Sequence, residues 1–172
     1  MPRLLVHVEG QTEETFVNEV LRPHLLRAGY ERVDARLLGN ARLRHHRGGI
    51  RGWGGARNDI VQHLKQDHGA IATTMVDFYG LPRTGGRSWP GRADAALLGA
   101  PEKALRVEEA IAEDIAINMG EGFDPSRFVP YVVLHEFEGL LFSDCEAFAR
   151  GIYRPDLRAA FQDIREDRKS VV

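Results

Sequence analysis

The stretch RLLVHVEGQTEETF, residues 3–16, decides the fold of this chain. Residues 3–8 are apolar and partly β-branched, and they are bounded by Pro2 and Gly10, which is typical of a short buried strand. From Thr12 onward the pattern changes, because a hydroxyl that can cap a helix is followed by acidic residues and then by one apolar face. The stretch therefore predicts a strand, a tight turn and a helix.

The rest of the chain repeats this alternation. We expect Pro23 to kink or end the first helix near Leu21, because proline cannot donate to the helical hydrogen-bond ladder. Strands that alternate with helices indicate a parallel sheet with helices on both faces. The expected fold is therefore α/β and Rossmann-like, with a mostly parallel sheet of about four strands. The further segments are strands at 32–38, 70–76 and 128–134, helices at 58–66 and 101–120, and short helices from 145 onward.

Length and composition favour one globular domain. A chain of 172 residues with 43% hydrophobic residues can bury one ordinary core. We expect the domain to cover residues 1–145, with a helical tail at 146–172 that is part of the same domain or a shortened remnant of it. No apolar run reaches the roughly 18 residues of a membrane span, and a single cysteine, Cys145, fits a reducing compartment. These features predict a cytoplasmic protein without a membrane partner.

The charge is distributed unevenly. The net charge is −2, but residues 39–57 hold five arginines and no acid, so the remainder carries 18 basic and 25 acidic residues. Six glycines in the same stretch favour a loop, and arginines interleaved with an aromatic ring suit contacts with nucleic acid. An alternative is that the loop is only solvated and that Trp53 and Trp89 pack beneath their own loops. The candidate nucleic-acid contacts are Arg42, Arg44, Arg47, Arg51, Trp53, Arg57, Arg83 and Arg87.

Acidic residues follow three of the expected strands. Because the carboxyl ends of parallel strands lie at one edge of the sheet, these side chains are expected to gather there. A helical residue one turn in, Glu13, points back toward the same edge. Each acid also has a simpler interpretation, as a turn residue, a solvated side chain or a partner of the helix dipole, and we assign Glu14 to the last. The acids at strand ends are Glu9, Asp77, Glu136 and Glu138.

A cluster of carboxylates requires a cation to offset its mutual repulsion. Oxygen ligands suit Mg²⁺ or Mn²⁺, whereas zinc favours imidazole and thiolate groups. A metal at this edge can polarise a phosphoryl oxygen and activate water, so phosphodiester chemistry is the leading expectation. His135, which precedes Glu136, is a candidate catalytic residue, although a structural hydrogen-bonded histidine is the more common case.

Three motifs resemble known families. VEGQTEE (8–14), TTMVDFYGLP (73–82) and LHEFEGLLFSD (134–144) together resemble the bacterial domain of unknown function 4276, and VEGQTE resembles the Toprim module of topoisomerases, primases and OLD-type nucleases. The resemblance implies a Toprim-like fold, with Glu9 as general acid or base and the other acids as metal ligands. The Toprim pair Asp-x-Asp reads Asp77-Phe78-Tyr79 here, so Glu136 or Glu138 would have to supply the lost carboxylate.

The sequence thus predicts a Mg²⁺-dependent, nuclease-type enzyme that acts on nucleic acid. Two other interpretations stay open at this point. One is a non-catalytic Toprim-like module that binds nucleic acid or a protein partner in a defence or mobile-element system. The other is a phosphohydrolase that acts on a small molecule.

Overall fold

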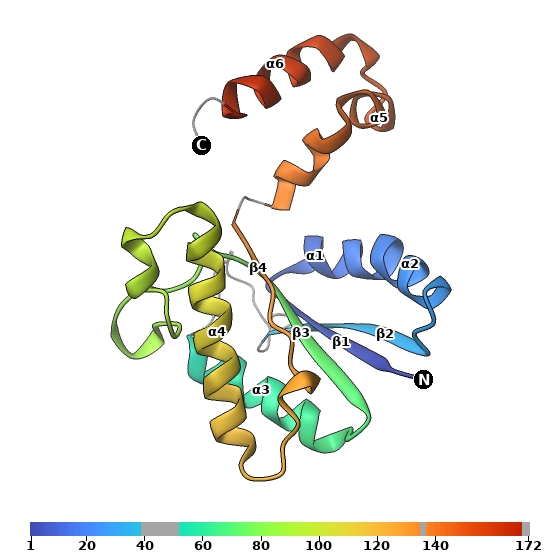
Figure 1. Ribbon diagram of the computed structural model, residues 1–172. Coiled ribbons are helices and arrows are strands. Elements are labelled where there is room, and N and C mark those ends of the chain that lie inside the picture. The colour runs from blue at the N-terminus through green and yellow to red at the C-terminus, as the bar shows by residue number, and fades with distance from the viewer. Residues whose placement is uncertain (39–51, 135–136, 170–172) are drawn as a thin grey trace, which may run out of the picture. The chain divides into compact units, whose positions relative to one another are not determined.

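The computed structural model describes residues 1–38, 52–134 and 137–169, with the side chains of 137, 138, 168 and 169 left out (Figure 1). The chain divides into two compact units, residues 1–134 and 135–172. The boundary that we expected after residue 145 falls inside the second unit, where one helical segment meets the next.

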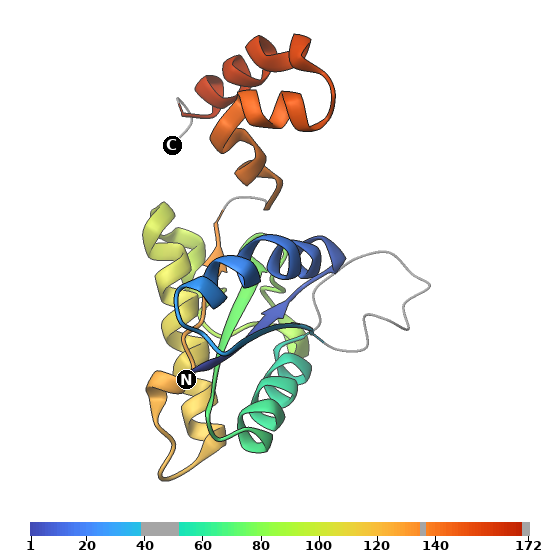
Figure 2. The same cartoon turned by 90° about the vertical axis from the view of Figure 1, so that its right-hand side faces the viewer.

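The first unit is built on a four-stranded sheet whose pairs are all parallel. The strands lie in the order β2-β1-β3-β4, so both β2 and β3 flank β1. Figures 1 and 2 show α1 and α2 over one face of the sheet and α3 and α4 over the other. The expected Rossmann-like α/β fold is confirmed. The strands are β1 (Arg3–Val8), β2 (Arg32–Leu37), β3 (Ala70–Asp77) and β4 (Val132–Val133).

The first crossover is one continuous helical path. It comprises α1 (Gln11–Phe16), a π-helical turn η1 (Val17–Leu21) and α2 (Arg22–Arg27). One expectation was wrong here, because Gly10, not Thr12, is the N-cap residue. Before Pro23 the helical path does not end, but its regular α-helical geometry is interrupted by the π-helical turn that ends at Leu21. The N–H of Arg22 bonds five residues back to Val17, and this wider turn places Pro23 in the first turn of α2, where its missing N–H costs little.

The helix α3 (Trp53–Gln66) begins five residues before the expected start at 58. Its first turns contain Gly54 and Gly55, which disfavour a helix by about 1 kcal/mol each. Trp53 and Ala56 are nevertheless buried in the core, and the burial of an aromatic ring outweighs that local preference.

The helix α4 (Ala100–Met119) packs beside α3 on the same face of the sheet (Figure 1), as expected from its apolar spacing. Val107, Ile111 and Ile115 are fully buried against α3 and β3. The expected strand 128–134 is shorter in the structure. Its early part makes only the bridge between Phe128 and Ala72, because Pro130 interrupts the ladder.

The second unit is helical. Its small core combines buried Cys145 and Ala149 with three half-buried aromatic rings, Phe142, Phe148 and Phe161, whose centroids lie 4.7–5.7 Å apart. The carboxylate of Asp144 accepts from the backbone N–H of Ala147 and caps the middle helix. The segments are η6 (Phe137–Asp144), α5 (Cys145–Gly151), η7 (Pro155–Leu157) and α6 (Arg158–Lys169), which agrees with the expected helical tail.

Gly91 allows the segment after β3 to pack closely against the backbone of α4. Its φ is +73°, and a Cβ there would lie 2.5 Å from the carbonyl oxygen of Arg106. We expect Gly91→Ala to lower the free energy of unfolding by about 2–4 kcal/mol, because it adds backbone strain and overpacking. Urea unfolding measures this change. Gly86→Ala is the matched control, since nothing lies within 4 Å of its Cβ position, and equal losses in the two variants would contradict the assignment.

Candidate functional site

The carboxyl ends of β1 and β3 form the topological switch point of the sheet. The chain leaves β1 for β2 on one side and later returns to β3 on the other, and ligands of such sheets bind where this reversal opens a crevice. The last pair of the register joins Val8, which precedes Glu9 by one residue, to Met75, which precedes Asp77 by two. Neighbouring strands lie about 4.8 Å apart. The turn that contains Glu9 and the end of β3 are therefore adjacent.

Glu13 folds back over this turn. Its Oε2 lies 3.1 Å from the position that a Cβ on Gly10 would occupy, so the carboxylate rests on the turn backbone. Gly10 has an extended φ of −142°, which any residue can adopt. Gly10 therefore leaves room for the Glu13 carboxylate, and its conformation does not require glycine. Glu9, Glu13 and the turn between them gather at the end of β1, as the sequence predicted for the first two acids.

Asp77 ends β3 and is half-buried. Its Oδ1 accepts a hydrogen bond of 3.1 Å from the backbone N–H of Tyr79, so it does form the turn that the simpler interpretation assigned to it. Among the described residues nothing donates to its other oxygen, Oδ2, and no arginine or lysine pairs with the carboxylate. One oxygen thus shapes the turn while the other is left for a ligand.

The described residues do not complete a metal centre by themselves. Within residues 1–38, 52–134 and 137–169, no group of three or more His, Cys, Asp or Glu side chains stands ready to hold a metal ion. The acids predicted to follow β4 are outside this description. His135 and Glu136 lie in a gap, and the side chain of Glu138 is left out. Glu9, Glu13 and Asp77 lie at this edge, but among the described residues their three side chains do not by themselves form a group that could hold a metal ion.

Arg92 is a residue of this edge that the sequence interpretation missed. It is only 8% exposed, and its Nε donates to the carbonyl oxygen of Phe78, the residue after Asp77, at 2.9 Å. Its guanidinium carbon lies 3.9 Å from the centroid of the Phe78 ring. Among the described residues its terminal nitrogens make no hydrogen bond or ion pair. The sequence signal that could have indicated Arg92 is its position directly after the turn-rich residues 83–91, which follow the motif TTMVDFYGLP at 73–82.

Burial is the main reason that the pKa of Arg92 falls below its ordinary value, and the nearby charge of Arg83 lowers it further. Asp77 and Tyr79 act in the opposite direction. A buried guanidinium stays protonated under these conditions, and it is stabilised by a neighbouring anion. The edge therefore combines carboxylates with a fixed cation that is close enough to Asp77 for its charge to influence the pKa of Arg92.

The two tryptophans are core residues. Trp53 is 5% exposed and donates through Nε1 to Asp114 at 2.6 Å, and its ring lies 4.8 Å from that of Trp89. The structure thus favours the alternative that both rings pack beneath their loops, and Trp53 does not offer a free face for a base. Arg57 lies 3.6 Å from Asp114. Arg83 and Arg87 are exposed, while Arg42, Arg44, Arg47 and Arg51 lie outside the described residues.

Fold and site together define a doubly wound α/β domain with acidic residues at the switch point of a parallel sheet. The chain belongs to the family described as "Domain of unknown function (DUF4276)", whose model matches residues 8–171. A search of curated proteins and a search of solved structures each found no match. Among the described helices, none combines the length and the apolar character that crossing a membrane requires.

Proposed function

We propose that this chain is a divalent-metal-dependent enzyme that cleaves phosphodiester bonds of nucleic acid, with a Toprim-like active site at the carboxyl edge of β1 and β3. The observation that carries the proposal is the placement of the Glu9–Glu13 turn next to Asp77 at the switch point of the sheet. In this proposal Glu9 is the general acid or base, and the other carboxylates hold the metal.

The donor set fits Mg²⁺ or Mn²⁺. All the side chains concerned carry carboxylate oxygens, and Asp77 has one oxygen without a donor among the described residues. A bound metal supplies Lewis-acid polarisation of the phosphoryl oxygen. Glu136 and Glu138 are proposed to add the ligands that the pair Asp77 and Tyr79 does not provide, and His135 is proposed as an accessory acid or base.

In this proposal the arginine side chains near the edge bind the phosphates of the substrate. Arg92 is fixed by its stacking on Phe78 and by its bond to the Phe78 carbonyl, so it can orient a phosphate with little loss of side-chain entropy. Exposed Arg83 and Arg87 on the same segment are proposed to contact neighbouring phosphates, together with the arginines of residues 39–57. A guanidinium beside the reacting phosphate also stabilises the charge that develops in the transition state.

A second candidate is a binding module without catalysis. It is favoured by Tyr79, which stands at the place of the second acid and is 61% exposed. In this alternative the same arginines bind nucleic acid or an acidic protein partner, and the carboxylates only shape the turns.

The test uses the full chain with labelled single- and double-stranded DNA and RNA, in Mg²⁺, Mn²⁺ or excess chelator. The proposal expects cleavage in metal and none in chelator. Binding that is equal in metal and chelator, with no cleavage in either, would indicate the binding module. Hydrolysis of nucleotides or simple phosphoesters without cleavage of the polymers would indicate the small-molecule phosphohydrolase.

A further inference from the structure

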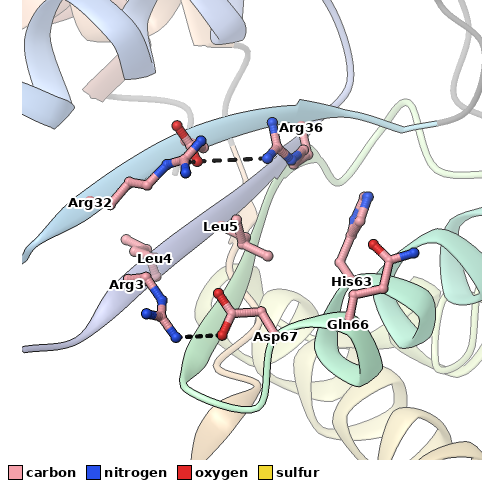
Figure 3. Close-up of a pocket in the computed structure, with 9 residues that line it drawn as sticks. Arg3, Leu4, Leu5, Arg32, Arg36, His63, Gln66 and Asp67 are labelled. Carbon is pink, nitrogen blue, oxygen red and sulfur yellow. Dashed lines mark hydrogen bonds and ion pairs between the residues drawn. The ribbon is translucent and has the colours of Figure 1, made fainter.

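A polar pocket lies on the face of the sheet that α3 covers, between β1, β2 and α3 (Figure 3). Its volume is about 120 Å³, which is roughly four times the space of one water molecule. Pockets for drug-sized ligands are larger, roughly 300–1,000 Å³. The pocket therefore has room for a small ion or for one functional group of a larger molecule. Its lining does not include Glu9, Glu13 or Asp77.

The wall formed by β2 has more positive than negative charge. Asp34 lies 2.6 Å from Arg32, 3.6 Å from Arg36 and 3.7 Å from Arg22, so three guanidinium groups share one carboxylate. At the other end of the pocket Arg3 is paired with Asp67 at 2.6 Å. Among the described residues the guanidinium of Arg36 makes no hydrogen bond, only this longer ion pair. Arg36 thus has donors available for an anion.

One lining residue, His63, is hydrogen-bonded to a second histidine, His7, which lies behind the lining. His7 is fully buried, and its Nδ1 lies 3.2 Å from the carbonyl oxygen of Thr73. Because a carbonyl only accepts, His7 carries its proton on Nδ1, and its Nε2 accepts from Nδ1–H of His63 at 2.9 Å. The remaining nitrogen of His63, Nε2, therefore has a lone pair when the ring is neutral. Among the described residues it has no hydrogen-bond partner.

Both histidines are held neutral near pH 7. Burial lowers the pKa of His7 to about 3, and His63 and Arg36 add to that effect, while the Thr73 carbonyl opposes it. The pKa of His63 also lies below its ordinary value, first because of burial and then because of Arg36, with Asp59 acting in the opposite direction. Figure 3 shows His63 rising from α3 toward the sheet beside Gln66, with Arg36 on β2. An acceptor and a cationic donor thus border one small space.

We propose that this pocket binds a phosphate-type oxyanion that retains one proton, either inorganic hydrogen phosphate or a terminal phosphomonoester in its monoanionic form, which has given up only its first proton. Its unprotonated oxygens accept hydrogen bonds from the Arg36 guanidinium and the Gln66 side-chain amide, and its O–H donates to Nε2 of His63. An ionised carboxylate has no proton to give, so it would leave His63 Nε2 without a partner. The site is independent of the proposed metal-dependent cleavage, because it shares no residue with the carboxyl edge.

The experiment titrates the full chain with inorganic phosphate at pH 7, with calorimetry for affinity and NMR for the imidazole nitrogens. We expect saturable binding and a shift of the His63 and His7 signals. Arg36→Gln and His63→Asn should each weaken binding at least about tenfold, since each removes a hydrogen bond to a charged ligand. His63→Asn keeps an N–H for His7 but lacks the second nitrogen. If that variant does not fold, Arg36→Gln on the edge strand β2 still tests the site.

The matched control is Arg106→Gln. Arg106 has a 42% exposed side chain and one aspartate partner, much like Arg36 at 40%, but it belongs to α4. The Arg106→Gln variant should bind phosphate with the same affinity as the unaltered protein. No saturable binding in the millimolar range, or equal binding by Arg36→Gln, would overturn the proposal, as would acetate that binds as tightly as phosphate.

A short oligonucleotide with a 5′-phosphate, compared at pH 6 with the same oligonucleotide with a 5′-hydroxyl and with free phosphate, identifies the source of the ligand, because about half of the phosphomonoester keeps its proton at that pH. If the phosphorylated oligonucleotide binds more tightly than free phosphate and the hydroxyl form does not compete, the site takes a terminal phosphomonoester. If free phosphate binds more tightly, inorganic phosphate is the ligand. Both results support the site.

Discussion

Replacing Asp77 with Asn is expected to reduce metal-dependent cleavage at least about 100-fold while the fold is preserved. Asparagine keeps an Oδ1 that accepts from the N–H of Tyr79, so the turn after β3 remains. What is lost is the negative charge on the oxygen assigned to the metal. Altering a residue that merely supports a metal ligand typically costs 10–100-fold, so loss of a ligand should cost at least the upper end of that range.

The measurement is the initial rate of oligonucleotide cleavage at several Mg²⁺ or Mn²⁺ concentrations. Glu9→Gln should show a comparable loss for a different reason, because an amide cannot transfer the proton that the carboxylate is proposed to carry. Asp94→Asn is the control, since Asp94 is an exposed acid that pairs with Arg106 beyond the edge. An Asp77→Asn variant that cleaves at the unaltered rate would remove Asp77 from the active site.

Acidification is expected to destabilise the first unit through His7. The folded pKa of His7 is about 3, and its unfolded value is about 6.5. Between these values the folded state binds fewer protons than the unfolded state, so stability rises with pH in this window and is fully present above about 6.5. As the pH falls toward 3, the loss approaches roughly 5 kcal/mol, which is comparable with the total stability of many domains.

Urea unfolding between pH 7.5 and 4.5 measures this effect, before most carboxylates begin to take up protons. The slope should approach about 1.4 kcal/mol per pH unit, and His63 should add in the same direction because its pKa is also lowered. His7→Gln offers an amide oxygen to His63 but does not titrate. It should be less stable at neutral pH and show a shallower slope, whereas an unchanged slope would show that His7 is not the group responsible.

Local sequence pattern was sufficient for the strands β1, β2 and β3 and for α4. Each has an apolar pattern of the right period, and each is bounded by proline, glycine or polar turns. The errors arose where tertiary contacts override local preference. Burial of Trp53 extends α3 across two glycines, and the local glycine pattern gives no sign of it. Pro23 did indicate an irregularity near Leu21, but not that a π-helical turn would let the helical path continue.

The candidate site was predictable only in part for a similar reason. Acids at strand ends can be read from the sequence because a parallel sheet brings its carboxyl ends together, which is how Glu9 and Asp77 were found. Arg92 and His63 were missed because their roles depend on contacts between separate elements. His7 and His63 are 56 positions apart in the sequence. Arg92 is held in place by the ring of Phe78, 14 positions before it.

The central claim is that acids from the ends of β1 and β3 share a divalent cation, and a crystal soaked in Mn²⁺ tests it most directly. We expect an anomalous peak about 2.0–2.5 Å from carboxylate oxygens that include Asp77 and at least one of Glu9 and Glu13. The peak should be absent from crystals of Asp77→Asn. Crystals that show no manganese at this edge at saturating concentration, or only at unrelated surface carboxylates, would contradict the claim.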